Sequence, residues 1–585
     1  MSEDPSPPPN TAFLNPPDQC DLIMQGGITS GVVYPGAVLK LAPRFKFRSI
    51  GGTSAGAIAA AATAAAELGR QRGGFDRLEQ LPKELGQCLL SLFQPTWPFR
   101  GVFAIFLAGL GNRSPWLKVP LVLWRILTCF PLALLIGLSP TLFYCARTWH
   151  PHRSALEWSA IIAAGFAGFI LAWLARLASL ALYHLPRALF GVCSGLTPPG
   201  GKPALTDWLT DLFDRLACFD LVTPSPLEGP LTFGQLTDAH IELKMMTTNL
   251  SSRRPYTLPF VTHHDNAERD GRYAFNAKEW RQYFPDRVIT WLTSPSHSKE
   301  VPGNPGFYYL PIPADLPVIV AVRLSLSFPG LLSAIPLYRK DYTYLHDTDY
   351  EQLRRCVFSD GGISSNFPIQ FFDNLLPTRP TFAIALDAYS QLRCTSDAPL
   401  ARVSMPEAAG QGFHLPVASI KSLPGFLGAI VNSARNWQDN LQRILPGYRE
   451  RVADIALTTS EGGLNLTMPP TLIQDLNALG SIAGDHMFKF DLQEHQWRRF
   501  LVAYARLEET FERMNLSYDG GFKAFLNTYP PTHTKSYHAS RAWFDAVRER
   551  IQALIDLTAP WSTNPLRPHG KIPKPDTDLR ITSKP

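Results

Sequence analysis

Two short apolar segments that end in glycines constrain the fold more than any other feature, and both lie between Asp21 and Thr63. The second segment, Phe45 to Ile50, leads into Gly51-Gly52-Thr53-Ser54-Ala55-Gly56 and then into an alanine run that favours a helix. A strand, a glycine turn, a serine and a helix make up the nucleophile-elbow pattern G-x-S-x-G. Its glycines, Gly52 and Gly56, avoid Cβ clashes in a strained turn. The pattern predicts Ser54 as a nucleophile, although a tight turn with an incidental serine also explains it.

The first segment, Leu22 to Met24, runs into the glycine pair Gly26-Gly27. Backbone N–H groups of such a loop form an oxyanion hole when they point at the charge that develops during acyl transfer, and the N–H of Ala55 is a further donor. An ordinary glycine-rich turn and a phosphate-binding loop remain open alternatives. Neither G-x-x-x-x-G-K-[ST] nor G-x-G-x-x-G occurs here, so nucleotide binding has no support.

A possible general base lies much later in the chain, where the apolar run Val357-Phe358-Ser359 ends in Asp360-Gly361-Gly362. A carboxylate at the carboxyl end of a sheet strand lies where open α/β sheets place their ligands. An Asp-Gly turn that only ends a strand is the alternative. A second Asp-Gly-Gly, at residues 519–521, has no strand before it and is interpreted as a turn. None of the fourteen histidines has a context that nominates it for a triad.

Further apolar runs indicate that the chain is an α/β protein. Buried strands are predicted at 241–246, 318–322, 357–359 and 382–386, and an amphipathic helix at 205–219. Buried strands separated by helical stretches favour a mostly parallel sheet that is covered on both faces. From about residue 415 onward the pattern is mostly helical.

Two long uncharged segments interrupt this α/β pattern. Ile126 to Tyr144 and Trp158 to Ala175 carry no charged residue, and each is close to the roughly 20 residues that span a bilayer. Ala164 and Gly168 give the second segment a small-residue face for close helix packing. We predict a helical hairpin that crosses a membrane twice. A hydrophobic lid that is buried on a soluble domain remains the alternative.

Composition limits the partners and the compartment. Charged residues make up 18% of the chain, below the usual share of about 25%, which agrees with membrane contact. The net charge of +6 comes without a dense Lys/Arg run, so nucleic-acid binding has little support. The eight cysteines form no C-x-x-C pair and are expected to be reduced, without disulfide or metal roles. The N-terminus lacks a signal-peptide pattern, so we expect the catalytic part on the cytoplasmic side.

The composition changes along the chain suggest a division into segments. The expected segments are a disordered proline-rich N-terminus (1–19), a catalytic domain (20–400) interrupted by the transmembrane hairpin (100–190), a helical C-terminal extension (401–558) and a disordered tail (559–585).

Several separated motifs, in order, resemble those of the patatin-like phospholipases, and in particular of a bacterial, membrane-associated branch. They are GGITSGVVYPGAVL, GGTSAG, PLTFGQL, MMTTNLSSRRPYTLPF, RLSLSFPGL, FSDGGISSNFPI, PGYRERV, EGGLNL and HQWRRF. Together they extend over most of the chain from residue 21 to about residue 500. The first loop departs from the family pattern, because one of three glycines and a basic residue are missing and the closing glycine, Gly31, comes one position late.

The resemblance implies a three-layer α/β/α fold and a Ser-Asp dyad made of Ser54 and Asp360. It also implies an oxyanion hole from Gly26, Gly27 and Ala55, with Gly361 and Gly362 as motif glycines beside the base. Such an enzyme hydrolyses acyl esters of membrane phospholipids and needs no metal or organic cofactor. Two other hypotheses stay open: a non-catalytic, membrane-anchored scaffold that keeps a patatin-like shell, and a Ser-His-Asp esterase.

Overall fold

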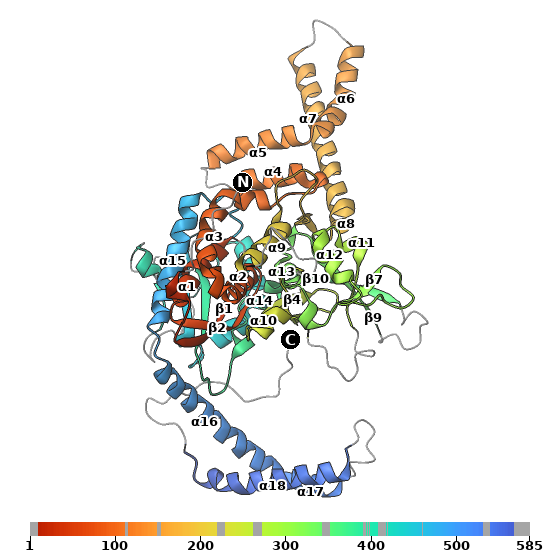
Figure 1. Ribbon diagram of the computed structural model, residues 1–585. Coiled ribbons are helices and arrows are strands. Elements are labelled where there is room, and N and C mark those ends of the chain that lie inside the picture. The colour runs from red at the N-terminus through yellow and green to blue at the C-terminus, as the bar shows by residue number, and fades with distance from the viewer. Residues whose placement is uncertain are drawn as a thin grey trace.

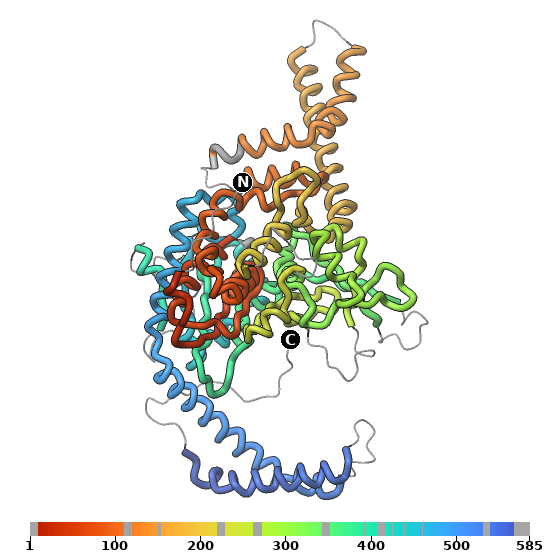
Figure 2. The backbone as a smooth tube through the Cα atoms, in the orientation of Figure 1, coloured from red at the N-terminus to blue at the C-terminus, as the bar shows by residue number. Residues whose placement is uncertain are grey.

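The computed structural model describes residues 10–566, apart from 28, 111–114, 149–153, 219–228, 261–271, 342–351, 390–393, 395, 397, 407–416, 418, 459 and 530–538. An α/β body forms the centre of the molecule (Figure 1). A pair of helices, α6 (Pro131–Arg147) and α7 (Ala155–Ser179), projects from one end of this body, and an arm that contains α16 (Leu492–Ser517) and α18 (Arg541–Thr563) extends from the other (Figures 1 and 2).

An eleven-stranded mixed sheet runs through the body in the order β12-β13-β11-β1-β2-β4-β10-β9-β6-β7, with β5 paired to β4. Its centre, β13-β11-β1-β2-β4, is parallel, and the remaining pairs are antiparallel. The prediction of a mostly parallel sheet therefore holds for the centre only. The strands are β1 (Asp18–Met24), β2 (Phe45–Gly52), β4 (Glu242–Asn249), β5 (Arg254–Leu258), β6 (Ala274–Asn276), β7 (Phe307–Tyr309), β9 (Ile335–Lys340), β10 (Leu353–Asp360), β11 (Thr381–Ala388), β12 (Val403–Ser404) and β13 (Val452–Leu457).

The strand register brings the predicted site residues to one end of the sheet. Met24 at the end of β1 is level with Gly52 at the end of β2, and Gly52 is level with Met245 in β4. Strand β10 runs antiparallel to β4, with Asp360 opposite Thr247. The loop after β1, the turn after β2 and the end of β10 are therefore neighbours, although they are far apart in the sequence.

Helices cover the sheet through unusually close backbone contacts. The alanine run forms α2 (Ala55–Leu68), which is buried along most of its length. Helix α1 (Tyr34–Leu41) packs on α15 (Pro470–Phe488), where a Cβ at Gly480 would lie 1.9 Å from the Val33 carbonyl oxygen. Because α15 comes from the C-terminal part of the chain and packs on the first helix, that part is integral to the body.

Two sequence predictions about secondary structure were wrong. Residues 318–322 are not a strand; they belong to helix α13 (Val318–Leu326), in which all nine residues are buried. A helix without a polar face has the same pattern as a buried strand, so periodicity does not separate the two. The stretch 401–558, expected to be helical, also contains β12 and β13, and β13 pairs with β11 in the central sheet.

The expected disordered N-terminus is also partly wrong. Residues 1–9 lie outside the described chain, but Asn10 caps a short 3-10 helix, Phe13 is buried in the core and β1 begins at Asp18. At the other end, α18 extends to Thr563, and the tail beyond residue 566 lies outside the described residues.

The apolar segments form a helical pair, but only one candidate membrane span is continuous. Helix α7 continues through a π-helical turn to Arg187, so that the continuous helix has 33 residues. This helix is long and apolar enough to cross a membrane, and most of its residues are exposed. Helix α6 packs against α7 at Gly137 and Gly168, where a Cβ on Gly168 would lie 2.4 Å from the Gly137 oxygen. The predicted span 126–144 is broken at Phe130, where α5 (Pro115–Cys129) and α6 meet at 81°. Between the two predicted spans, residues 149–153 lie outside the described chain.

Candidate active site

Ser54 occupies the apex of the turn between β2 and α2, with φ 57° and ψ −126°. A positive φ is strained for a residue with a side chain, as expected at a nucleophile elbow. The flanking glycines are required by close approach: a Cβ at Gly52 would lie 2.2 Å from the Gly56 oxygen, and one at Gly56 would lie 2.3 Å from the Met24 oxygen. The predicted strand-turn-helix geometry around Ser54 is therefore present.

Asp360 ends β10, and its carboxylate is buried beside the serine turn. Its Oδ1 accepts the N–H of Gly362 at 2.7 Å, and its Oδ2 is buried without a hydrogen-bond partner. A Cβ at Gly361 would lie 2.0 Å from the Met246 oxygen, so only glycine fits after the aspartate. Burial raises the pKa of Asp360 to about 6, against the opposing effects of the Ser54 hydroxyl and the Gly362 N–H. A carboxyl with that pKa can act as a base near neutral pH.

The glycine loop has a different arrangement from the one expected of an oxyanion hole. The N–H of Gly26 donates to the Asn366 carbonyl at 2.8 Å, so Gly26 does not supply a free donor. The carbonyl of Gly27 accepts both the Ser54 hydroxyl at 3.0 Å and the Ala55 N–H at 3.3 Å. Of the three predicted donors, Gly26 and Ala55 each give their N–H to a carbonyl oxygen, whereas the N–H of Gly27 has no hydrogen-bond partner among the described residues.

Two residues that the sequence analysis did not single out hold these groups in place. The Ser54 N–H donates to Ser325 Oγ at 3.1 Å, at the end of α13. Asn366 holds Gly26 on both sides, because its side-chain amide also donates to the Gly26 carbonyl at 3.0 Å. Both residues belong to motifs quoted above, RLSLSFPGL and FSDGGISSNFPI, and this was the only signal that could have found them.

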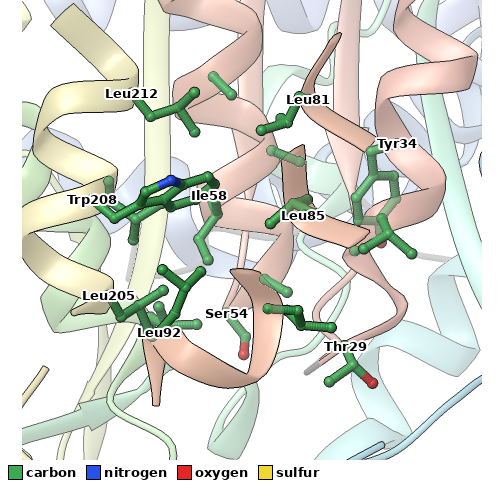
Figure 3. A pocket seen from close by; sticks show the side chains of 18 of the residues that line it. Thr29, Tyr34, Ser54, Ile58, Leu81, Leu85, Leu92, Leu205, Trp208 and Leu212 are labelled. Atoms are coloured by element: carbon green, nitrogen blue, oxygen red, sulfur yellow. The ribbon is translucent and has the colours of Figure 1, made fainter. Parts of the chain in front are cut away.

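An apolar pocket opens at Ser54 and runs along α2 between two other helices (Figure 3). Helix α3 (Gly74–Cys88) and helix α9 (Leu205–Leu216) line it with leucines and Trp208. The α2 residues that line the pocket extend from Ala55 to Thr63, which is about 12 Å along the helix axis. The pocket is narrow, with about 90 Å³ of free volume. Its length and apolar walls suit a hydrocarbon chain.

A wider polar cleft meets the same serine from the other side. It has a volume of about 1300 Å³ and is lined by Ser54, Asp360, the Gly26-Gly27 loop and residues of α14 (Leu423–Arg443). Ser54 and Phe328 line both cavities. The described residues that line either cavity include no histidine. The described part of the chain contains no group of three or more His, Cys, Asp or Glu side chains that could hold a metal ion.

A family model and two known proteins match this chain. A family model described as patatin-like phospholipase matches residues 22–116, which include the glycine loop and Ser54. The chain is 32% identical over 654 aligned positions to the "RpoH suppressor" of Rhizobium meliloti (strain 1021), covering 97% of this chain and 99% of that protein. The crystal structure of VipD from Legionella pneumophila aligns with 95% of this chain and 89% of its own, at a TM-score of 0.29 and 12% identity.

Proposed function

Because this chain belongs to the patatin-like phospholipase family, a family of lipid acyl hydrolases, we propose that it hydrolyses acyl esters of membrane lipids through a Ser54–Asp360 dyad. One observation carries the proposal: Ser54 lies where an apolar pocket of about 12 Å meets a wide polar cleft. An acyl ester has the same two parts, a hydrocarbon chain and a polar alcohol, on either side of its carbonyl.

The chemistry follows from the groups around Ser54. Its Oγ attacks the ester carbonyl carbon while Asp360 accepts the hydroxyl proton. The oxyanion needs the Ala55 N–H, so the Gly27 carbonyl must first leave that donor. Collapse of the tetrahedral intermediate expels the alcohol, which takes the proton from Asp360 and leaves an acyl-enzyme. Water then attacks the acyl carbonyl, Asp360 accepts its proton, and the fatty acid leaves as the proton returns to Ser54.

Asp360 meets the requirements of the base in such a dyad. The unpartnered Oδ2 is a buried acceptor with no competing donor among the described residues. Burial favours the proton-accepting step, because the raised pKa makes the carboxylate a stronger base than it is in water. A Ser-His-Asp triad has less support, since no described histidine lines either cavity.

The hydrogen bonds of Gly27 favour one competing function, a non-catalytic scaffold with a patatin-like shell. If the Gly27 carbonyl never leaves the Ala55 N–H, Ala55 cannot donate to an oxyanion. Catalysis and a scaffold therefore make opposite predictions for the reactivity of the Ser54 hydroxyl.

Lipid product analysis with full-length protein separates these functions. Wild type and Ser54→Ala are incubated with phospholipid vesicles, and free fatty acids and lysolipids are measured by mass spectrometry. We expect release by the wild type only, and labelling of Ser54 by a fluorophosphonate probe. A folded wild type that neither releases fatty acid nor reacts with the probe would support the scaffold.

A further inference from the structure

Helix α14 places Arg435 in the cleft, where it forms no ion pair with any described residue, and we infer that Arg435 binds the phosphate of a glycerophospholipid whose acyl ester lies at Ser54. This inference rests on the proposed function and deepens it, because it names the residue that sets the preference for phospholipids over neutral glycerides.

The charges of the cleft identify Arg435 as its free cation. Five of the described lining residues are charged, namely Asp360, Asp387, Arg435, Asp439 and Arg443. Arg443 is fully engaged: it donates to both carboxylate oxygens of Asp387, at 3.0 and 2.8 Å, and also pairs with Asp454. The guanidinium of Arg435 forms no ion pair among the described residues, and its one hydrogen bond is to the side chain of Asn436.

Asp439, one turn further along α14, forms no ion pair with Arg435. Its Oδ1 accepts the Ser365 hydroxyl at 2.7 Å, and its Oδ2 accepts the N–H groups of Asn366 and Phe367 at 2.8 and 3.0 Å. Both carboxylate oxygens of Asp439 therefore accept hydrogen bonds from the loop that follows Asp360. These hydrogen bonds fix α14 against the active site, and so fix the position of Arg435 relative to the dyad.

Arg435 lines the same cleft as Ser54 and Asp360. Its positive charge acts on both Asp360 and Asp439, lowering the pKa of each against the effect of burial. The apolar pocket and the cleft share Ser54, so an ester bound with its acyl chain in the pocket has the cleft available for its alcohol part. In a glycerophospholipid that alcohol part carries a phosphate, for which a guanidinium is the preferred protein ligand.

The face of α14 that points away from the cleft agrees with a lipid that enters from an aggregate. Phe426, Leu427 and Trp437 on α14 are 50%, 55% and 59% exposed, and they do not line the cleft. A helix with an exposed apolar face and a polar face is typical of segments that meet the headgroup region of a lipid surface. A neutral diacylglycerol would use the apolar contacts but would leave Arg435 without a partner.

The test compares two substrates that differ by the phosphocholine group. Full-length wild type, Arg435→Gln and Arg435→Lys are assayed at about pH 8, well above the pKa of Asp360 of about 6, in mixed micelles with phosphatidylcholine and with diacylglycerol of the same acyl chains. We expect Arg435→Gln to lower kcat/KM for phosphatidylcholine about 10- to 100-fold, the usual range for a lost charge-assisted hydrogen bond, and to change the diacylglycerol value little at this pH. Arg435→Lys should recover part of the loss. Arg498→Gln, which removes a half-exposed helical arginine outside both cavities, is the matched control.

Two further arms make the outcomes distinct. The pH profile of diacylglycerol hydrolysis should move to higher pH in Arg435→Gln, because Asp360 loses a nearby positive charge. Inorganic phosphate and glycerol 3-phosphate are added as competitors. We expect little inhibition, because the phosphate that Arg435 binds is part of a lipid. Strong inhibition that depends on Arg435 would show instead that the site binds a free phosphate compound. An equal loss on both substrates would overturn phosphate recognition. Hydrolysis of neither substrate by the wild type would instead refute the proposed function.

Discussion

The carbonyl oxygen of Gly27 accepts a hydrogen bond from the Ser54 hydroxyl at 3.0 Å, and the same oxygen accepts one from the Ala55 N–H at 3.3 Å. The donor that should stabilise a developing oxyanion is thus occupied by a neighbouring carbonyl. Since Gly26 is held on both sides by Asn366, a turn of the Gly27 peptide is the smallest movement that releases Ala55. This relationship makes the loop a determinant of the acylation rate.

Asn366→Asp should lower activity, because Asn366 holds Gly26 in the loop that contains Gly27. The substitution replaces the amide that donates to the Gly26 carbonyl with a carboxylate, which repels that oxygen and adds a negative charge near Asp360. We expect at least a tenfold fall in kcat for a soluble ester, in line with the loss of one oxyanion donor at about 3 kcal/mol. The rate of fluorophosphonate labelling at Ser54 should fall in parallel. Unchanged kinetics in a folded Asn366→Asp protein would show that Asn366 does not position the loop.

The pH dependence of hydrolysis should report Asp360. Only the ionised carboxylate accepts the serine proton, and the pKa of Asp360 is raised to about 6, so kcat/KM should rise with pH and reach half its maximum near pH 6. The measurement uses an ester without ionisable groups from about pH 4 to pH 8. A midpoint near 4, the ordinary value for Asp, would contradict a buried base.

Asp360→Asn should abolish hydrolysis and stabilise the fold near neutral pH. A carboxyl whose pKa is higher in the folded than in the unfolded chain binds more protons when folded, so wild-type stability falls as pH rises from about 4 to about 6. A pKa that is roughly two pH units higher in the folded chain lowers the free energy of unfolding by about 3 kcal/mol at pH values above that window. The neutral amide of the Asp360→Asn variant avoids this loss. Thermal unfolding should show Asp360→Asn melting above wild type at pH 7.5, with a smaller difference at pH 4.5. A lower melting temperature for Asp360→Asn than for wild type at pH 7.5 would mean that the fold stabilises the ionised carboxylate of Asp360.

Acyl-chain preference should change when the apolar pocket is narrowed or widened. Ala59 lines the pocket one turn beyond Ala55, so Ala59→Leu places a larger side chain across the path of a long chain. We expect the ratio of kcat/KM for p-nitrophenyl palmitate to that for p-nitrophenyl butyrate to fall about tenfold, within the range for steric exclusion from an apolar site. Trp208→Ala should change the ratio in the opposite direction. If neither variant alters the ratio, the acyl chain binds elsewhere.

Membrane association should depend on the exposed face of α7. Ile162 and Leu171 are each 68% exposed, and an arginine at either position costs about 2.5–3.5 kcal/mol if it lies at the bilayer centre. The double variant with Ile162→Arg and Leu171→Arg should therefore move the full-length protein from the membrane fraction to the soluble fraction in a flotation assay. Trp543→Arg on α18, at a similar exposure of 60%, is the matched control and should not. Unchanged flotation of the α7 variant would favour a lid on the soluble body over a membrane anchor.

The sequence was sufficient for groups whose positions depend on local structure. Ser54 lies two residues after the end of β2, Asp360 is the last residue of β10, and glycines lie close to both, so their placement was predictable from short motifs. The central strands β1, β2, β4, β10 and β11 were predictable for the same reason, since each is a buried apolar run.

Groups whose roles depend on tertiary contacts could not be predicted. Gly26 and Ala55 were named as donors, but which acceptor each meets depends on Asn366 and on the orientation of the Gly27 peptide. Strand β13 was missed because it is a short run inside a mostly helical stretch, and it becomes a strand only through pairing with β11. Helix α13 was mistaken for a strand because burial on all sides removes its periodicity.

The strand order also determines when during synthesis the enzyme acquires its activity. Strand β1 pairs with β2, which follows it closely, and with β11, which the ribosome makes much later. The proposed nucleophile Ser54 and the apolar helix α7 both emerge before β10, which carries the proposed base Asp360, and before β13 completes the parallel centre of the sheet. Because domains fold as units during translation, a nascent chain that carries Ser54 has neither Asp360 nor its finished sheet. If α7 engages a membrane during translation, as we propose, it does so before the proposed dyad is assembled.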